Sequence, residues 1–470
     1  MIFALFNGSG SLSGGSLALL IVALAIALGF EFVNGFHDTA NAVATVIYTK
    51  SLRPWPAVLW SGFCNFCGVY LGGTAVAFSI VNLLPVDLLI RAGSGAGLAM
   101  VLALLIAAIL WNLGTWFLGL PTSSSHTLIG AIVGVGLANS LLPGHVFGEG
   151  VNWDKAGEVG LSLLLSPLIG FSLSAGLYLL LKATIRSPEL YAAPPEDRPP
   201  PFWIRAVLVS TCTGVSFAHG SNDGQKGIGL IMLILIGVVP AHYALNPETS
   251  ASQVQQTVAA AAQLESLLRQ RESIPGVSAL LDRLTDLRAT LERYPTLRSI
   301  PEGDRWRVRA DLLKLSKGLA TLKRAKHSGI STQEWKAVEQ CRAEMKLLIE
   351  YSPTWVLMAV ATALGVGTTV GWKRIVLTVG EKIGKSHLTY AQGASAELVA
   401  MSTIGLADLG GLPVSTTHVL SSGVAGTMAA SGSGLQGRTV RNIALAWLLT
   451  LPVSMLLAGG LYLVFRLAVV

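Results

Sequence analysis

The stretch Gly35-Phe36-His37-Asp38-Thr39-Ala40-Asn41-Ala42 places a histidine, an aspartate and an asparagine inside a run of sequence that is otherwise strongly apolar. An ionisable group at membrane depth costs about 2.5–3.5 kcal/mol on insertion scales, and such groups mark ion or substrate pathways by default. The stretch therefore predicts a functional site within a membrane-spanning region.

Two motifs of the chain occur twice. Residues 218–226 (AHGSNDGQK) again set an aspartate among small and polar residues, with Asp223 following Asp38 by 185 positions. Residues 120–126 (LPTSSSH) return as residues 412–418 (LPVSTTH), 292 positions later. This pattern predicts an internal duplication of one structural unit. The spacing between copies is 107 residues longer for the second motif than for the first, which predicts an insertion in the second copy.

The composition is typical of a multi-pass membrane protein. Of the 470 residues, 52% are hydrophobic and 13% are charged, whereas soluble domains carry about 25% charged residues. Apolar runs long enough to cross a bilayer recur along the chain. We expect spans near 16–33, 57–81, 97–119, 159–183, 204–218, 226–244, 354–371, 388–409 and 442–468.

The first apolar run has no basic segment before it and leads directly into the Asp38 stretch, so we expect a retained span rather than a cleaved signal. The net charge of +7 does not indicate nucleic-acid binding. Residues 248–350 alone hold 17 of the 33 Lys and Arg and 13 of the 26 Asp and Glu, which is typical of a charged soluble insert. No nucleic-acid partner is expected.

Residues 120–141 and 412–432 differ from the other apolar segments. Each begins with proline and a run of Ser and Thr and is rich in glycine, which favours a re-entrant hairpin over a plain spanning helix. The expected fold class is an all-α polytopic membrane protein with an inverted-topology repeat, two re-entrant helical hairpins and a soluble helical insert.

The expected domains follow from these boundaries. They are a first transmembrane repeat at 1–183, a Pro-rich linker at 184–203, the start of the second repeat at 204–245, the insert at 246–352 and the rest of the second repeat at 353–470. If the second repeat is inverted, twelve Lys and Arg residues of the short loops lie on the cytoplasmic side and three lie on the opposite side. Inversion then places the insert outside the cell.

The hairpins suggest how an anion could bind. A helix that begins inside the membrane presents unpaired N–H groups and the positive end of its dipole, which bind anions without formal charge. Nearby hydroxyls add neutral donors. The expected substrate-binding residues are Thr122, Ser123, Ser124, Ser125, Ser415, Thr416 and Thr417.

Ionised aspartates do not bind an anion directly, so Asp38 and Asp223 need a cation such as a proton, sodium or a divalent metal. The expected ion-coupling residues are Asp38, Asn41, Asp223, Asn222, Lys226, His37 and His219. Lys226 lies one helical turn after Asp223 and aligns with Asn41 of the first copy. We hypothesise that its ammonium stands where sodium would otherwise bind. The roles of Glu31 and Glu397 stay open.

Two other classes of protein fit parts of this pattern. An intramembrane serine protease also combines Ser with His, but it needs one nucleophile and one base rather than duplicated hydroxyl runs. A divalent metal-ion carrier or channel built on Asp38, His37, Asp223 and His219 is the stronger alternative.

At these motifs the sequence resembles the inorganic phosphate transporter (Pit) family, most closely its low-affinity bacterial branch. The resemblance rests on residues 36–42, on 221–226 and on the Pro-Ser/Thr-His hairpins, and it extends over the whole chain. It implies low-affinity uptake of inorganic phosphate by proton-coupled symport with alternating access, in part as neutral metal–phosphate complexes carrying Mg²⁺ or another divalent cation.

The resemblance further implies a homodimer in the bacterial inner membrane, in contact with lipid, with no cofactor and no enzymatic activity. The hairpin hydroxyls would then contact phosphate, and the paired aspartates would contact the coupling ion. This chain departs from the family motif at His37, Gln225 and Lys226, which argues against the sodium sites of other members. A sodium-coupled phosphate or sulfate symporter of the same fold remains the alternative within the family.

Overall fold

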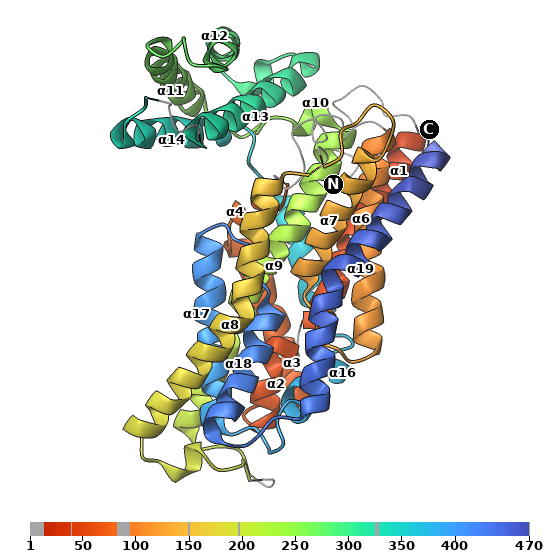
Figure 1. The fold of residues 1–470 in the computed structure, drawn as a ribbon, viewed down its shortest axis with the longest axis vertical. Coiled ribbons are helices and arrows are strands. Elements are labelled where there is room, and N and C mark those ends of the chain that lie inside the picture. The colour runs from red at the N-terminus through yellow and green to blue at the C-terminus, as the bar shows by residue number, and fades with distance from the viewer. Residues whose placement is uncertain are drawn as a thin grey trace. The chain divides into compact units, whose positions relative to one another are not determined.

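The computed structural model describes residues 14–38, 40–81, 95–148, 151–195, 198–324 and 329–469, and their regular elements are helices (Figure 1). These are α1 Gly14–Asp38, α2 Ala40–Tyr48, α3 Pro54–Leu71, α4 Ala75–Val81, α6 Gly95–Phe117, α7 Ser124–Ser140, α8 Trp153–Thr184, η2 Pro188–Leu190, α9 Phe202–Val238, α10 Pro240–Tyr243, α11 Ala251–Arg269, α12 Val277–Arg293, η3 Leu297–Ser299, α13 Glu302–Arg324, α14 Thr332–Lys346, α15 Thr354–Thr368, α16 Lys373–Leu377, η4 Thr378–Lys382, α17 Tyr390–Leu409, α18 Thr416–Ser431 and α19 Gly437–Val469.

The prediction of an all-helical membrane protein is confirmed at this level. Within the described ranges, four stretches are long and apolar enough to cross a membrane, and the bent pair α15 and α16–η4 makes a fifth if it counts as one span. The four stretches are Gly14–Tyr48, Gly97–Phe117, Ala156–Thr184 and Gly437–Leu467.

The prediction of separate spans at 204–218 and 226–244 is wrong. Helix α9 runs without a break from Phe202 to Val238, through the repeated motif and its aspartate. The polar side chains of the motif find hydrogen-bond partners on other segments. Asn65 contacts His219, and Ser125 accepts from Lys226. Asn222 bonds to the backbone of Leu412 and Val414. The predicted span 57–81 is instead divided, since α3 ends at Leu71 and Gly73 adopts a left-handed φ of 85° before α4 begins.

Helices α7 and α18 begin in the same way. The hydroxyl of Ser123 accepts a hydrogen bond from the backbone N–H of His126, and the hydroxyl of Ser415 accepts one from that of His418. Both serines have extended backbone and act as N-caps, which satisfy one of the free N–H groups at a helix start. The repeated hairpin motif is therefore a helix-start sequence at both places.

Close helix packing occurs at repeat-related glycines. A Cβ added at Gly68 of α3 would lie 2.1 Å from the carbonyl oxygen of Phe217 in α9, and one at Gly367 of α15 would lie 2.2 Å from that of Phe32 in α1. The same holds for α7 and α18. A Cβ at Gly134 would lie 2.2 Å from the Met455 carbonyl oxygen of α19. These backbones approach so closely only because the glycines carry no side chain.

Residues 232–352 form a compact unit together with residues 14–20 and 95–97 of the described chain, and its helices α11, α12, α13 and α14 enclose a leucine-rich core. Two of these helices begin with a capping box, Ser250 with Gln253 and Ser331 with Glu334. The buried guanidinium of Arg309 donates to the carbonyl oxygens of Ala244 and Ile349. Arg309 thus ties the segment that enters this unit to the segment that leaves it.

Candidate functional site

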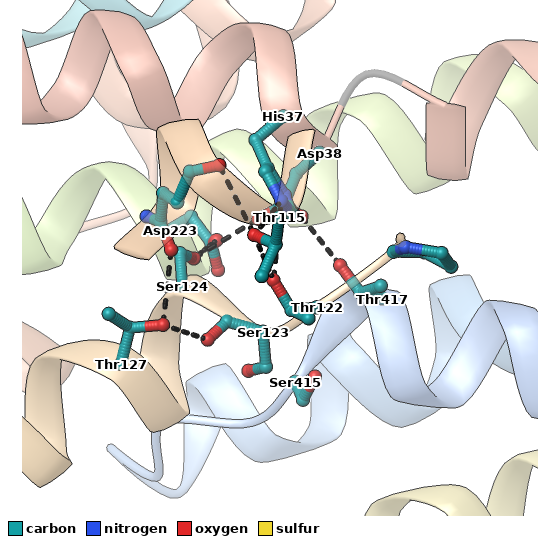
Figure 2. Close-up of polar contacts among 12 residues, drawn as sticks. His37, Asp38, Thr115, Thr122, Ser123, Ser124, Thr127, Asp223, Ser415 and Thr417 are labelled. Atoms are coloured by element: carbon teal, nitrogen blue, oxygen red, sulfur yellow. Dashed lines mark hydrogen bonds and ion pairs between the residues drawn. The ribbon is translucent and has the colours of Figure 1, made fainter. Parts of the chain in front are cut away.

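The predicted aspartates meet at the start of α7 (Figure 2). Asp38 is the last residue of α1, and Asp223 lies within α9. The hydroxyl of Ser124 lies 3.1 Å from Oδ2 of Asp38 and 3.2 Å from Oδ2 of Asp223, so it can donate to either carboxylate. Thr417, from the first turn of α18, donates to Oδ1 of Asp38 over 2.5 Å. One hydroxyl from each hairpin motif therefore contacts an aspartate.

A buried lysine compensates the second aspartate. Nζ of Lys226 lies 2.6 Å from Oδ1 of Asp223 and 2.5 Å from the Ser125 hydroxyl, and the Lys226 side chain is fully buried. An ammonium is stable at such a place only when its donors are paired. The Ser125 hydroxyl also donates to the carbonyl oxygen of Val414, just before α18. Lys226 is thereby linked to both hairpin segments.

His219 stands between the two carboxylates. Its Nε2 lies 3.4 Å from Oδ2 of Asp223 and 3.8 Å from Oδ2 of Asp38, and its Nδ1 donates to Oδ1 of Asn65 over 2.9 Å. With both aspartates ionised and Lys226 protonated, the group carries one net negative charge when the histidines are neutral. We refer to Asp38, Asp223, Lys226, His219, Ser124, Ser125 and Thr417 as the aspartate cluster.

His37 connects the aspartate cluster to a pair of threonines. Its Nδ1 lies 3.3 Å from Oδ1 of Asp38, and its Nε2 lies 3.2 Å from the hydroxyl of Thr115 and 3.3 Å from that of Thr122. The two threonine hydroxyls are themselves 2.9 Å apart. The sequence predicted Thr122 but missed Thr115, which lies at the end of an apolar helix with no motif around it.

The remaining predicted residues have other places. Asn222 holds the segment before α18, since its Nδ2 donates to the Leu412 carbonyl and its Oδ1 accepts from the Val414 N–H. Ser123 and Ser415 serve as N-caps. Thr416 is buried in the first turn of α18. The side chain of Asn41 lies outside the described part of the chain.

The hydrogen-bond partners of two further acidic residues were not predicted. Asp408, at the end of α17, accepts hydrogen bonds from Ser221 and from Nε2 of Gln225. The fully buried Glu397 accepts from the hydroxyls of Thr45 and Thr211. An acidic residue in an apolar membrane helix is energetically unfavourable, so Glu397 stands out in the sequence. The sequence does not show which residues donate hydrogen bonds to it.

Asp38, His219 and Asp223 could hold a cation, because one ligand atom from each lies within 4.8 Å of the others. Carboxylate oxygens and an imidazole nitrogen suit several divalent ions. Lys226 already neutralises Asp223, however, and a second cation beside its ammonium would be repelled. The donor set therefore fits a proton more readily than a divalent metal.

Buried ionisable groups gathered between apolar helices, beside helices that start within the bundle, are the arrangement that membrane transport proteins use. The fold and the cluster define a protein of this class. The sequence profile of the phosphate transporter family matches residues 34–458. The chain belongs to this family.

Several relatives support this assignment. The chain is 44% identical to the low-affinity inorganic phosphate transporters PitB and PitA of Escherichia coli (strain K12), over 94% of this chain and 96% of theirs. It is 29% identical to a probable low-affinity inorganic phosphate transporter of Bacillus subtilis (strain 168), over 96% of this chain and 98% of that protein. The relatives are transporters by name, not enzymes.

Among solved structures, a sodium-dependent phosphate transporter matches 96% of this chain and 99% of its own, with a TM-score of 0.55 and 22% identity. This likeness supports the fold alone. The predicted resemblance to the phosphate transporter family is thus confirmed.

Replacing Ser124 by alanine is expected to weaken phosphate transport by about tenfold or more, because it removes a predicted hydrogen bond to the phosphate anion. A hydrogen bond to a charged group contributes about 1.5–3 kcal/mol, and each 1.4 kcal/mol changes an affinity about tenfold. Initial uptake rates over a range of phosphate concentrations measure this. Ser140→Ala is the matched control, since Ser140 ends the same helix and its hydroxyl donates to the Leu137 carbonyl. Wild-type kinetics for Ser124→Ala, for Thr416→Ala and for the double variant would contradict the assignment of the hairpins as the anion site.

Proposed function

We propose that the protein takes up inorganic phosphate by proton-coupled symport through an alternating-access mechanism. Membership of the phosphate transporter family supports phosphate as the substrate. Lys226 supports a proton as the coupling ion. Its ammonium contacts Oδ1 of Asp223, and a coupling sodium ion would need that carboxylate oxygen to be free. Low affinity is part of the proposal, by analogy with the named relatives.

Electrostatics favour this coupling. A dianion that enters against an inside-negative potential costs about 2.3 kcal/mol per charge and per 100 mV. The aspartate cluster adds no net positive charge to offset this cost. Protons that accompany the anion would supply the compensating positive charge. A divalent cation such as Mg²⁺, carried with phosphate as a neutral complex, would do the same.

The two helix starts suggest how the anion is held. Helices α7 and α18 would present their N-termini to it from re-entrant positions, in an inverted repeat with the insert at 246–352 on the outer side. The repeat-related glycine contacts and the paired N-caps support this arrangement. We further propose a homodimer in the bacterial inner membrane, surrounded by lipid.

Uptake of labelled phosphate into vesicles tests the proposal. Accumulation should follow an imposed proton gradient rather than a sodium gradient, and it should be compared with magnesium present and with magnesium chelated. Accumulation that follows only the sodium gradient would overturn proton coupling. Asp38, His219 and Asp223 are close enough together to bind a cation, so a metal carrier is the second candidate. That candidate predicts metal uptake in the absence of phosphate.

The inverted topology predicts that the insert faces outward. A cysteine placed at the exposed position Ser299, in a background that lacks the buried Cys341, should react with a membrane-impermeant thiol reagent in intact cells. A cysteine at the exposed Lys50 is the matched control and should react only after permeabilisation. The reverse pattern would contradict the proposed topology.

A further inference from the structure

Glu31 of α1 is a buried acid to which no other described helix donates a hydrogen bond. Its relative exposure is 0%, and neither carboxylate oxygen accepts a hydrogen bond from another helix among the described residues. Asn34, one helical turn further on, is equally buried, and its side-chain amide lies beside the Glu31 carboxyl group. The two side chains lie on one face of α1, since residues three apart are neighbours on a helix.

Helix α9 packs against Glu31. A Cβ added at Gly227 would lie 2.3 Å from Cγ of Glu31 and 2.6 Å from its Oε1, so the glutamate packs directly over that glycine. The ionisable groups that act on Glu31 are Asp223, Lys226 and His219, all on the same helix. None of them donates a hydrogen bond to it, and Lys226 directs its ammonium to Asp223 and Ser125.

An ionised carboxylate in this position would have the Asn34 amide beside it but no hydrogen bond from a cationic group, because Lys226 donates to Asp223 and Ser125. Moving a charge out of water without pairing costs several kcal/mol, so a buried acid of this kind is stable in the neutral, protonated form. Glu397 shows the contrast within the same chain, because two threonine hydroxyls donate to its oxygens. The burial of Glu31 therefore requires a bound proton, and Asn34 offers an amide oxygen to accept it.

We propose that Glu31 carries the proton that is transported with phosphate. This assignment rests on the proton-coupled symport proposed above and names the residue that performs the coupling. The proton binds a carboxylate oxygen of Glu31 from the outer solution and leaves from the same oxygen to the inner solution. No covalent step is involved.

A chain of contacts links this site to the anion site. The hydroxyl of Ser125, in the first turn of α7, accepts a hydrogen bond from the ammonium of Lys226. Gly227, which follows Lys226 in α9, packs against the side chain of Glu31. An anion at the start of α7 competes for Lys226 and places negative charge nearby. Both effects favour the protonated form of Glu31, and by reciprocity a protonated Glu31 favours binding of the anion.

The test uses the full-length protein in vesicles that contain a pH-sensitive dye. Wild-type protein should acidify the lumen when phosphate is added outside and should accumulate phosphate under an imposed proton gradient. Glu31→Gln should lose both, while exchange of labelled against unlabelled phosphate across the membrane stays measurable. Glu189→Gln makes the same chemical change at an exposed position of η2 and is the matched control.

Two further variants change the surroundings or the length of the side chain at position 31 but keep a carboxyl group there. Glu31→Asp keeps a carboxyl group and should retain coupling, with a shifted pH dependence of uptake. Gly227→Ala should displace Glu31 and reduce coupling, because the added methyl group meets its carboxyl group. An unshifted pH dependence in Glu31→Asp would overturn the assignment, even if Glu31→Gln does not fold.

The outcomes separate the two proposals. Proton influx in Glu31→Gln at the wild-type ratio to phosphate would overturn the role of Glu31 and leave proton coupling standing. Phosphate transport by the wild-type protein without any proton movement would overturn the proposed function itself.

Discussion

Replacing Lys226 by asparagine is expected to abolish proton-driven phosphate uptake and to lower the free energy of unfolding by about 3–5 kcal/mol, the range found when one partner of a buried ion pair is removed. The variant leaves the fully buried Asp223 without its cation and Ser125 without its donor. Thermal stability in detergent and uptake into vesicles measure the two effects separately.

The double variant Asp223→Asn, Lys226→Asn is the matched control for charge. It should recover most of the stability, because no unpaired charge remains, but it should not recover transport. Lys226→Arg should rescue only in part, since a planar guanidinium does not reproduce the compact ammonium between Asp223 and Ser125. Lys226→Asn should also admit stimulation by sodium, because an amide then stands beside a free carboxylate. Unchanged rates and an unchanged response to pH and sodium in this variant would contradict the role of Lys226.

Replacing Gly134 by alanine is expected to destabilise the protein by about 1–3 kcal/mol, the usual cost of overpacking a tight contact, and to reduce the amount of folded protein in the membrane. The added methyl group would lie 2.2 Å from the Met455 carbonyl oxygen, so α7 and α19 would have to move apart. Because α7 also carries Ser124 and Ser125, this movement should weaken transport as well.

The control for this variant is Gly176→Ala. Gly176 lies within α8, and a Cβ added there meets nothing within 4 Å. Alanine is favoured over glycine inside a helix by about 0.5–1 kcal/mol, so the control should be neutral or slightly stabilising. The repeat-related Gly426→Ala, with Phe171 as the close neighbour, should behave like Gly134→Ala. Equal thermal stability for Gly134→Ala and Gly176→Ala would show that this contact does not limit the packing.

The residues of the aspartate cluster were largely recognisable before the structure was known. Repetition of the motifs around Asp38 and Asp223 and around Ser124 and Thr417 singled them out. The separation into an anion site and an ion-coupling site was too sharp, because hydroxyls of the first kind donate directly to carboxylates of the second. Which hydroxyl meets which carboxylate depends on how closely the helices approach, and sequence spacing does not contain that information.

Features that depend only on residues close together in the chain can be predicted from the amino-acid sequence. Apolar length and low charge indicate a membrane protein, and the duplicated motifs indicate its family. The sequence assigned Ser123 and Ser415 to substrate binding, whereas the structure places both as N-caps, a contact within one helical turn. Only the tertiary structure decided that α9 continues through its polar motif and that Thr115 and Asp408 join polar networks. It also shows that no other described helix donates a hydrogen bond to Glu31, whereas two threonines donate to Glu397. The reason is physical: the stability of a polar group inside an apolar bundle depends on donors and acceptors from other helices, which lie far away in the sequence.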